Sequence, residues 1–302
     1  MKKLYGITVA MVTPMDKNEK PDLAAVADLT DKLIGRGVNC LYPCGTTGEM
    51  LKLTLAERKA VAETVIRTAA GRVNVFIHVG AANAAETLEL ALHAREAGAD
   101  GVGIVTPQFF GCNPRELTNY YDEIADGLPE DFPIYLYGIP QCAANDISPE
   151  VAKDLYERHP NIVGIKYSFL DMDRTAAYLA VAPEFSVLHG CDRLMTSMLI
   201  LGCDGTVSGV SGVVPEPFVK AYNAYMAGDL ATAQVWQKAG YEICTILKHG
   251  SNMGYFKSGL EWRGVAGGHM RRPQLDLTEA ENTALFSQLE AYFAKYQLER
   301  KL

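Results

Sequence analysis

Residues 160–171 of the chain read PNIVGIKYSFLD. The run Ile162-Val163-Gly164-Ile165 is apolar without interruption, which is typical of a strand that is buried on both faces of a parallel sheet. A strand with one face in water would alternate apolar and polar residues instead. The apolar run is followed at once by Lys166. The segment therefore predicts a buried strand with a charged side chain at its carboxyl end.

Seven further apolar runs resemble this one. Three of them follow helix-like segments that end in Gly37, Gly98 and Gly202, and glycine is common just past the end of a helix. The eight predicted strands lie within residues 7–14, 36–45, 73–80, 97–107, 133–140, 161–168, 185–191 and 201–211. Their spacing, mostly about 20–35 residues, is the repeat length of strand–helix units.

The intervening segments carry helix-start signals. The segments that begin at Thr54 and Thr278 have capping boxes, the segment at Asn83 resembles one, and Pro114 and Pro149 suit the first position of a helix. Strands that alternate with helices in this way predict an α/β fold, a (β/α)₈ TIM barrel, rather than an open doubly wound sheet. No G-x-G-x-x-G follows the first strand, so a dinucleotide site is not expected.

The strand signals stop after about residue 215. We therefore predict a barrel with the active site over residues 1–214 and a C-terminal helical extension, packed on the barrel, over residues 215–302.

Composition excludes several classes of function. The 302 residues have a net charge of −8 and no basic stripe, which argues against a nucleic-acid partner. No run of about 18 apolar residues suggests a membrane span. Seven cysteines without paired spacing are typical of reduced thiols in a cytoplasmic protein. Neither C-x-x-C nor H-x-x-x-H spacing occurs, so we expect no metal site.

Three motifs are expected to meet at one mouth of the barrel, because active sites of such barrels lie at the carboxyl ends of the strands. Lys166 ends the sixth predicted strand, Tyr137 lies near the end of the fifth, and the sequence GTTGE (45–49) follows the second.

Each motif has a chemical interpretation and a plainer one. Burial of Lys166 disfavours the ammonium form and gives a nucleophilic amine that can form a Schiff base, although many strand-end lysines only reach solvent. The glycine-rich turn offers backbone N–H groups and the hydroxyls of Thr46 and Thr47 to a small carboxylate, or it serves turn geometry alone. Tyr137 is either a proton shuttle beside the lysine or a buried aromatic residue.

At these residues the chain resembles a known superfamily. GTTGE (45–49), Y-x-I-P (137–140) and GIK (164–166) are similar to the motifs of the dihydrodipicolinate synthases and N-acetylneuraminate lyases, which are pyruvate-dependent Schiff-base aldolases of class I. The resemblance continues through GITVAMVTP near the start and RRPQLDLTEAE near the end. It implies a TIM barrel with a helical C-terminal extension, a homotetramer built as a dimer of dimers, and neither a metal nor an organic cofactor.

The resemblance also implies roles for single residues. Lys166 would form the imine with C2 of pyruvate or of a pyruvate-derived 2-keto acid, and Tyr137 would shuttle protons. Thr46 and Thr47 would hold the carboxylate of the keto acid. Val207 would pack near the pyruvate methyl group. Ser168, Gly190 and Asp192 match the sugar-hydroxyl contacts of the neuraminate lyases.

Four positions depart from the patterns of the family. Cys142 stands where the synthases have an arginine for the carboxylate of aspartate semialdehyde, and a thiol cannot replace a bidentate guanidinium. Phe109 stands where a tyrosine often extends the proton relay of a neighbouring subunit. Arg193 and Gly209 depart from the neuraminate lyases. Arg193 could meet a second carboxylate or a phosphate, or it forms a solvated pair with Asp192.

The leading hypothesis is a metal-independent lyase that cleaves a 2-keto-3-deoxy sugar acid to pyruvate and an aldehyde through an imine at Lys166. The alternatives are a synthase-like or neuraminate-lyase-like activity, and a keto-acid dehydratase that uses the same imine. An alternative from another class is a catalytically silent homologue that binds keto acids, which the identities of Phe109 and Cys142 suggest.

Overall fold

The computed structural model describes all 302 residues, and eight parallel strands form a closed barrel in sequence order. Each strand coincides with one of the predicted runs. The strands are β1 (Gly6–Ala10), β2 (Cys40–Tyr42), β3 (Asn74–His78), β4 (Gly101–Val105), β5 (Ile134–Gly138), β6 (Ile162–Tyr167), β7 (Ser186–His189) and β8 (Gly205–Ser208). β1 pairs with β8, which closes the barrel.

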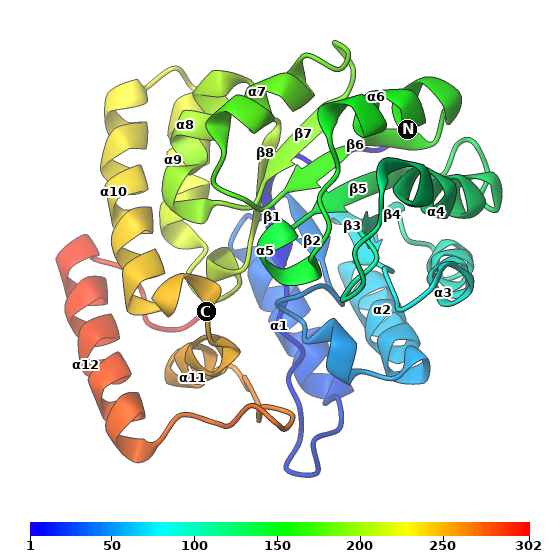
Figure 1. The fold of residues 1–302 in the computed structure, drawn as a ribbon. Helices are drawn as coiled ribbons and strands as arrows, with labels where there is room; N and C mark the ends of the chain where they lie inside the picture. The colour runs from blue at the N-terminus through cyan, green and yellow to red at the C-terminus, as the bar shows by residue number, and fades with distance from the viewer.

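Helices connect the strands and surround the barrel, as Figure 1 shows. They are α1 (Leu23–Gly35), α2 (Leu55–Ala69), α3 (Ala84–Glu96), α4 (Pro114–Asp126), α6 (Pro149–Arg158), α7 (Met172–Leu179), α8 (Met195–Leu201) and α9 (Glu216–Met226). One short helix, α5 (Pro140–Ala143), and the 3₁₀ turns η1 (Met50–Lys52), η2 (Asp192–Leu194) and η3 (Val210–Gly212) lie in the loops after strands. The predicted TIM barrel is confirmed.

The helix-start signals act as the sequence predicts. Thr54 and Thr278 form full capping boxes, and Asn113 forms a third. The side chain of Asn83 accepts a hydrogen bond from the backbone N–H of Glu86, but the backbone N–H of Asn83 donates none to the Glu86 side chain. These contacts satisfy backbone donors that a helix leaves unpaired at its start.

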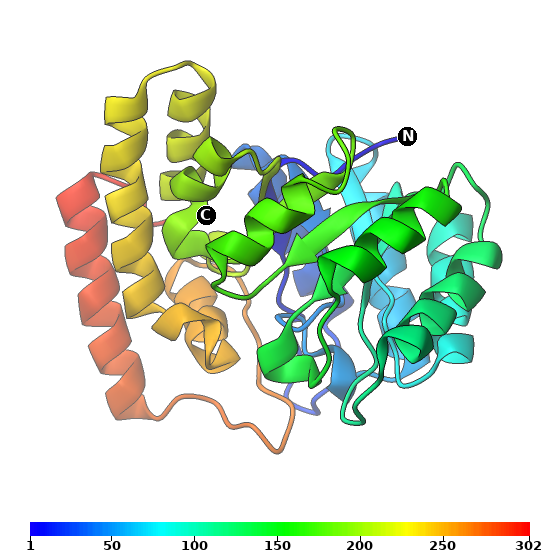
Figure 2. The same cartoon turned by 45° about the horizontal axis from the view of Figure 1, so that its top comes forward.

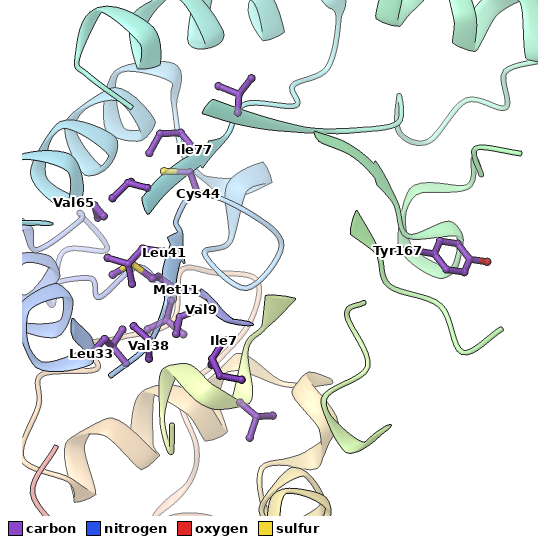
Figure 3. Packing of buried hydrophobic residues seen from close by; sticks show 14 of the residues in the cluster. Ile7, Val9, Met11, Leu33, Val38, Leu41, Cys44, Val65, Ile77 and Tyr167 are labelled. Carbon is purple, nitrogen blue, oxygen red and sulfur yellow. The ribbon is translucent and has the colours of Figure 1, made fainter. Parts of the chain in front are cut away.

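Two of the three apolar clusters make up the core of the barrel. The larger has 63 buried residues and lies between the strands and the helices around them. Figure 3 shows part of it, where Val9, Leu41 and Leu33 pack together. The smaller fills the barrel interior with nine residues, which are Leu4, Ala10, Cys40, Tyr42, Phe76, Tyr135, Val163, Leu188 and Val207. The interior is therefore a packed floor beneath the carboxyl ends of the strands.

An irregularity in β6 decides which way Lys166 points. Ile134 of β5 pairs with Ile162, but the next residue, Tyr135, pairs with Gly164, so that Val163 is an extra residue in β6. Val163 belongs to the interior cluster, whereas Ile165 lies in the outer one. Because side chains alternate along a strand, regular pairing from Val163 would point Ile165 inward and Lys166 outward. The extra residue reverses this alternation.

Three further helices stand beyond the barrel on one side, as Figures 1 and 2 show. They are α10 (Leu230–Ile246), α11 (Met253–Trp262) and α12 (Glu279–Tyr296), with the 3₁₀ turn η4 (Lys248–Gly250) between α10 and α11. α9 follows β8 and packs against β1, which is the position of an eighth barrel helix. The predicted division at residue 214 counts α9 with the extension, and that division stays a prediction. None of the helices is long and apolar enough to cross a membrane.

Gly164 leaves no room for a side chain, which provides a test of the irregularity in β6. A Cβ at this position would lie 2.1 Å from the backbone oxygen of Ser186 in β7. We expect Gly164→Ala to lower the free energy of unfolding by about 1–3 kcal/mol, as overpacking does, measured by urea denaturation. Gly35→Ala is the matched control, because nothing lies within 4 Å of its Cβ. Equal stability of the two variants would contradict this account.

Candidate active site

Lys166 lies at the floor of the barrel mouth. It is the penultimate residue of β6, and 4% of it is exposed. Its Nζ is 3.8 Å from the centre of the Tyr137 ring and 4.9 Å from the centre of the Tyr42 ring, and it has no ion-pair partner in the chain. Ring faces at these distances attract a cation. The amine is thus held between two aromatic rings and faces the cavity.

Tyr137 is fixed beside the lysine by strand register. β5 and β6 pair Tyr137 directly with Lys166. The phenol is buried, and its hydroxyl is 3.3 Å from Oγ1 of Thr46, a contact in which either atom can donate. The two hydroxyls therefore form a chain that can pass a proton from the cavity floor to the turn after β2.

The turn after β2 is held by hydrogen bonds at both ends. Glu49 N donates to the carbonyl of Thr46 over 3.1 Å, and Thr13 Oγ1 donates to the carbonyl of Gly48 over 2.8 Å. Cys44 and Glu49, which flank GTTG, both have the left-handed backbone with φ of 61°. This conformation is uncommon for residues other than glycine, so the turn has a defined shape that presents Thr46 and Thr47 to the cavity.

A buried ion-pair network ties this turn to the C-terminal extension. The carboxylate of Glu49 is 2.7 Å from Nζ of Lys257 in α11 and 2.6 Å from Nζ of Lys52. Lys257 also donates to the carbonyl of His269 over 2.5 Å. The side chains of Glu49 and Lys257 are 3% and 2% exposed. Charges this deeply buried are tolerated when they are paired and hydrogen-bonded.

Most of the predicted site residues line one cavity of about 210 Å³ above the floor. Those that line it are Thr46, Thr47, Tyr137, Cys142, Lys166, Ser168, Gly190, Asp192, Val207 and Gly209. We call this the inner cavity. It draws side chains from the ends of β5, β6 and β8 and from the loops after β2, β5, β6, β7 and β8.

Glycine is required at two positions of this wall because other groups approach closely. A Cβ at Gly190 would lie 2.0 Å from Oγ of Ser168. A Cβ at Gly209 would lie 3.1 Å from Oγ1 of Thr47 and 2.9 Å from the ring of Phe256. The absence of side chains at 190 and 209 thus lets Ser168 and Thr47 occupy their places in the wall.

Asp192 lies on the β7 side of the cavity. Its Oδ2 accepts a hydrogen bond from the backbone N–H of Val210 over 3.3 Å, while its Oδ1 is buried without a partner. Burial raises the pKa of this carboxyl to about 6, although hydrogen bonds from Ser208 and Val210 and the charge of Lys166 act in the other direction. An unpaired buried acceptor is costly, so this oxygen can accept a hydroxyl group of a ligand.

A second cavity of about 300 Å³ adjoins the first, and we call it the outer cavity. The two share Gln141, Ser168, Gly190, Asp192, Val210 and His249. Arg193 lines the outer cavity and forms no direct ion pair with Asp192. Phe109 lines neither cavity; it is 85% exposed, and its ring packs edge to face against Phe110.

The sequence did not identify several residues that complete the site. His249, Gly250, Met253 and Phe256 reach the inner cavity from the C-terminal extension. Tyr42 lies beneath the lysine. Their motifs carry no signal of chemistry, because only the packing of the extension onto the barrel brings them to the mouth.

A buried guanidinium lies behind Tyr137 and Tyr42. Arg58 of α2 donates to the carbonyls of His78 and Gly80 and has no carboxylate partner. The ring of His78 lies edge-on to that of Tyr137, 5.8 Å away. Burial, together with the charges of Arg58 and Lys166, holds the pKa of His78 well below its usual range. His78 is therefore a neutral packing partner of Tyr137.

No cluster of three His, Cys, Asp or Glu side chains could hold a metal ion.

Comparison with known proteins places this chain in one family of enzymes. The model of the dihydrodipicolinate synthetase family matches residues 3–292. A 4-hydroxy-tetrahydrodipicolinate synthase of Methanoculleus marisnigri is 33% identical over 93% of this chain and 96% of its own. The probable 2-dehydro-3-deoxy-D-pentonate aldolase YjhH of Escherichia coli is 34% identical over 79% of this chain and 80% of its own.

Among solved structures, YagE of Escherichia coli K12 in complex with pyruvate superposes with a TM-score of 0.91. It is 29% identical, and the match covers 96% of this chain and 99% of that one. The chain belongs to the dihydrodipicolinate synthetase family and is one of its lyases. The family recognised from GTTGE, Y-x-I-P and GIK is confirmed.

The Glu49–Lys257 pair should be essential for stability. Lys257→Met would leave Glu49 buried with one of its two cations, and we expect it to lower the free energy of unfolding by about 3–5 kcal/mol, the usual effect of breaking a buried pair. Lys153→Met is the control, because Lys153 and Glu157 are an exposed pair at 3.8 Å; it should change stability by less than about 1 kcal/mol. Urea denaturation measures both, and similar small losses would contradict the assignment.

Proposed function

We propose that this protein is a Schiff-base lyase that reversibly cleaves a 2-keto-3-deoxy sugar acid to pyruvate and an aldehyde, without a metal or an organic cofactor. The single observation that carries the proposal is the position of the Lys166 amine, which lies against the Tyr137 ring in a cavity that also contains the threonine turn. An amine, a phenol and a carboxylate cradle are the groups that imine chemistry on a 2-keto acid requires.

The first step is the formation of the imine. The substrate carboxylate binds the hydroxyls and backbone N–H groups of Thr46 and Thr47, which points C2 of the keto acid at Lys166. The uncharged amine attacks C2, and the carbonyl oxygen takes up a proton from Tyr137. Loss of water from this adduct gives the protonated imine. Val207 closes the cavity behind the three-carbon fragment.

Cleavage uses the imine as an electron sink. The C4 hydroxyl gives its proton to the Tyr137–Thr46 chain, the C3–C4 bond breaks, and its electron pair enters the imine, which becomes an enamine. The aldehyde leaves, and the enamine is protonated at C3 and hydrolysed to pyruvate and free Lys166. In the proposed tetramer, Phe109 would bring no hydroxyl to the relay of a neighbouring subunit, so the chain of protons ends at Thr46, at water or at a substrate hydroxyl.

Two features support a sugar acid as substrate. Cys142 provides no cation for the carboxylate of aspartate semialdehyde, which disfavours a synthase activity. Asp192 and Ser168 offer acceptors to hydroxyl groups. Two relatives from Escherichia coli are named as aldolases of 2-dehydro-3-deoxy sugar acids, YjhH as probable and YagE as putative.

The shortened relay at Phe109 favours, as second candidate, a dehydratase on the same imine, which would release water and no pyruvate.

We also propose that the protein assembles as a homotetramer. Phe109 and Phe110 pack against each other at 5.1 Å between ring centres but are 85% and 76% exposed. Adjacent apolar rings at such exposure are typical of a surface that a second copy covers. Light scattering after size exclusion tests this assembly, and a monomer at micromolar concentration would contradict it.

Borohydride reduction with pyruvate tests the imine. We expect a covalent pyruvate adduct on the peptide that contains Lys166, because reduction traps the imine. Lys166→Ala should abolish both trapping and turnover. Tyr137→Phe should slow turnover by roughly 10²–10⁴-fold, the usual contribution of a positioned acid–base group, and should keep some trapping. Unmodified Lys166 in the wild-type protein would refute both enzymatic candidates and favour a silent keto-acid-binding homologue.

The pKa of Asp192 predicts a dependence on pH. The carboxyl is ionised above about pH 6 and neutral below it, and the neutral form is a weaker acceptor for substrate hydroxyls. We therefore expect kcat/KM for a hydroxylated keto acid to fall as the pH drops through about 6. Asp192→Asn should have a lower kcat/KM without this acidic limb. The same limb in both proteins would show that another group is responsible.

A further inference from the structure

Arg193 is the charged group that the proposed chemistry leaves unused. It follows Asp192 in η2 and lines the outer cavity, where no carboxylate pairs with it. Elsewhere in the chain most buried or half-buried guanidiniums have a carboxylate or several carbonyl partners, as Arg174, Arg263 and Arg271 do. An unpaired guanidinium in a cavity is suited to an anion.

The charges around the outer cavity favour an anion as well. Asp192 is its only acidic lining residue, and the Oδ2 atom of that residue is directed to the backbone N–H of Val210. His249 lines the cavity from the C-terminal extension, in a left-handed backbone with φ of 53°. Burial, followed by the charges of Arg193 and Lys248, lowers the pKa of His249.

The two cavities form one path that leads away from Lys166. Ser168, Gly190 and Asp192 belong to both, so they mark the passage between them. Lys166 is the only lysine or arginine that lines the inner cavity, and Arg193 is the only one that lines the outer cavity. A substrate whose keto end is bound at Lys166 would pass its hydroxyl groups along Asp192 and place its far end at Arg193.

We propose that Arg193 is a specificity residue that binds a second anionic group at the far end of the substrate. The substrate class is then a 2-keto-3-deoxy sugar acid that ends in a carboxylate or a phosphate instead of a primary alcohol. Both groups have the planar or forked oxygens that a guanidinium binds through two hydrogen bonds. The inference rests on the proposed function, because the imine at Lys166 sets the position of the substrate.

Three keto acids that differ only at the far end test the inference: 2-keto-3-deoxygluconate, its 6-phosphate, and the corresponding 2-keto-3-deoxyaldarate with a 6-carboxylate. The measurement is the half-saturating concentration of each for the borohydride-trapped adduct at Lys166, which requires no turnover. The half-saturating concentration of the alcohol, divided by that of each anion, reports on binding at the far end of the substrate alone. We expect at least one anion to bind roughly tenfold or more tightly than the alcohol. The anionic compound with the larger ratio shows whether the site prefers a carboxylate or a phosphate.

Variants connect this preference to Arg193. Arg193→Met should reduce the ratio by roughly 10- to 100-fold, the effect of losing a charge-assisted hydrogen bond, and Arg193→Lys should restore part of it. Arg95→Met is the matched control, because Arg95 is exposed at the end of α3 and forms no ion pair; it should leave the ratio unchanged.

Three outcomes would overturn the inference. The first is tighter binding of the alcohol than of both anions, and the second is an unchanged ratio in Arg193→Met. In both, trapping of pyruvate at Lys166 would persist, so the proposed function would stand while the inference on the far end fails. The third is the absence of trapping with any keto acid, which would reject the proposed function and the inference together.

Discussion

The extra residue Val163 in β6 is the constraint on which the site depends. Side chains alternate along a strand, so a shift of one residue exchanges the inner and outer faces. With Val163 accommodated, Ile165 packs outward and Lys166 turns inward opposite Tyr137. Gly164 allows this because a side chain there would meet the backbone of β7. The amine, the phenol and the threonine turn then share one cavity, and without this shift the lysine would lie among the apolar side chains beneath the helices.

The fold could be predicted almost completely, and the site only in part. The eight apolar runs coincide with the eight strands because burial on both faces leaves a continuous signal. The motifs around Thr46, Tyr137 and Lys166 meet because parallel strands end at one mouth. The inward turn of Lys166 was not predictable from periodicity, since regular alternation from Val163 points it outward. His249, Met253 and Phe256 were missed because an appended helix carries no sequence signal for the surface on which it packs.

The C-terminal extension completes the site as well as covering the barrel. Through Lys257 it binds Glu49 at the end of the threonine turn, and through η4 it supplies His249 and Gly250 to the cavity wall. In the proposed function, groups of the barrel on one side of the mouth would hold the keto acid. The other side, from Asp192 to Arg193 and His249, would meet whatever the aldehyde fragment carries.

The central claim is that Lys166 bonds covalently to C2 of a keto acid whose carboxylate lies on the turn at Thr46 and Thr47. A crystal structure of the protein soaked with pyruvate tests it most directly. We predict continuous electron density from Nζ of Lys166 to C2, with the carboxylate at the threonine turn and the Tyr137 hydroxyl beside the new bond. Pyruvate bound without a covalent bond to Lys166, or with its carboxylate away from the turn, would contradict the account.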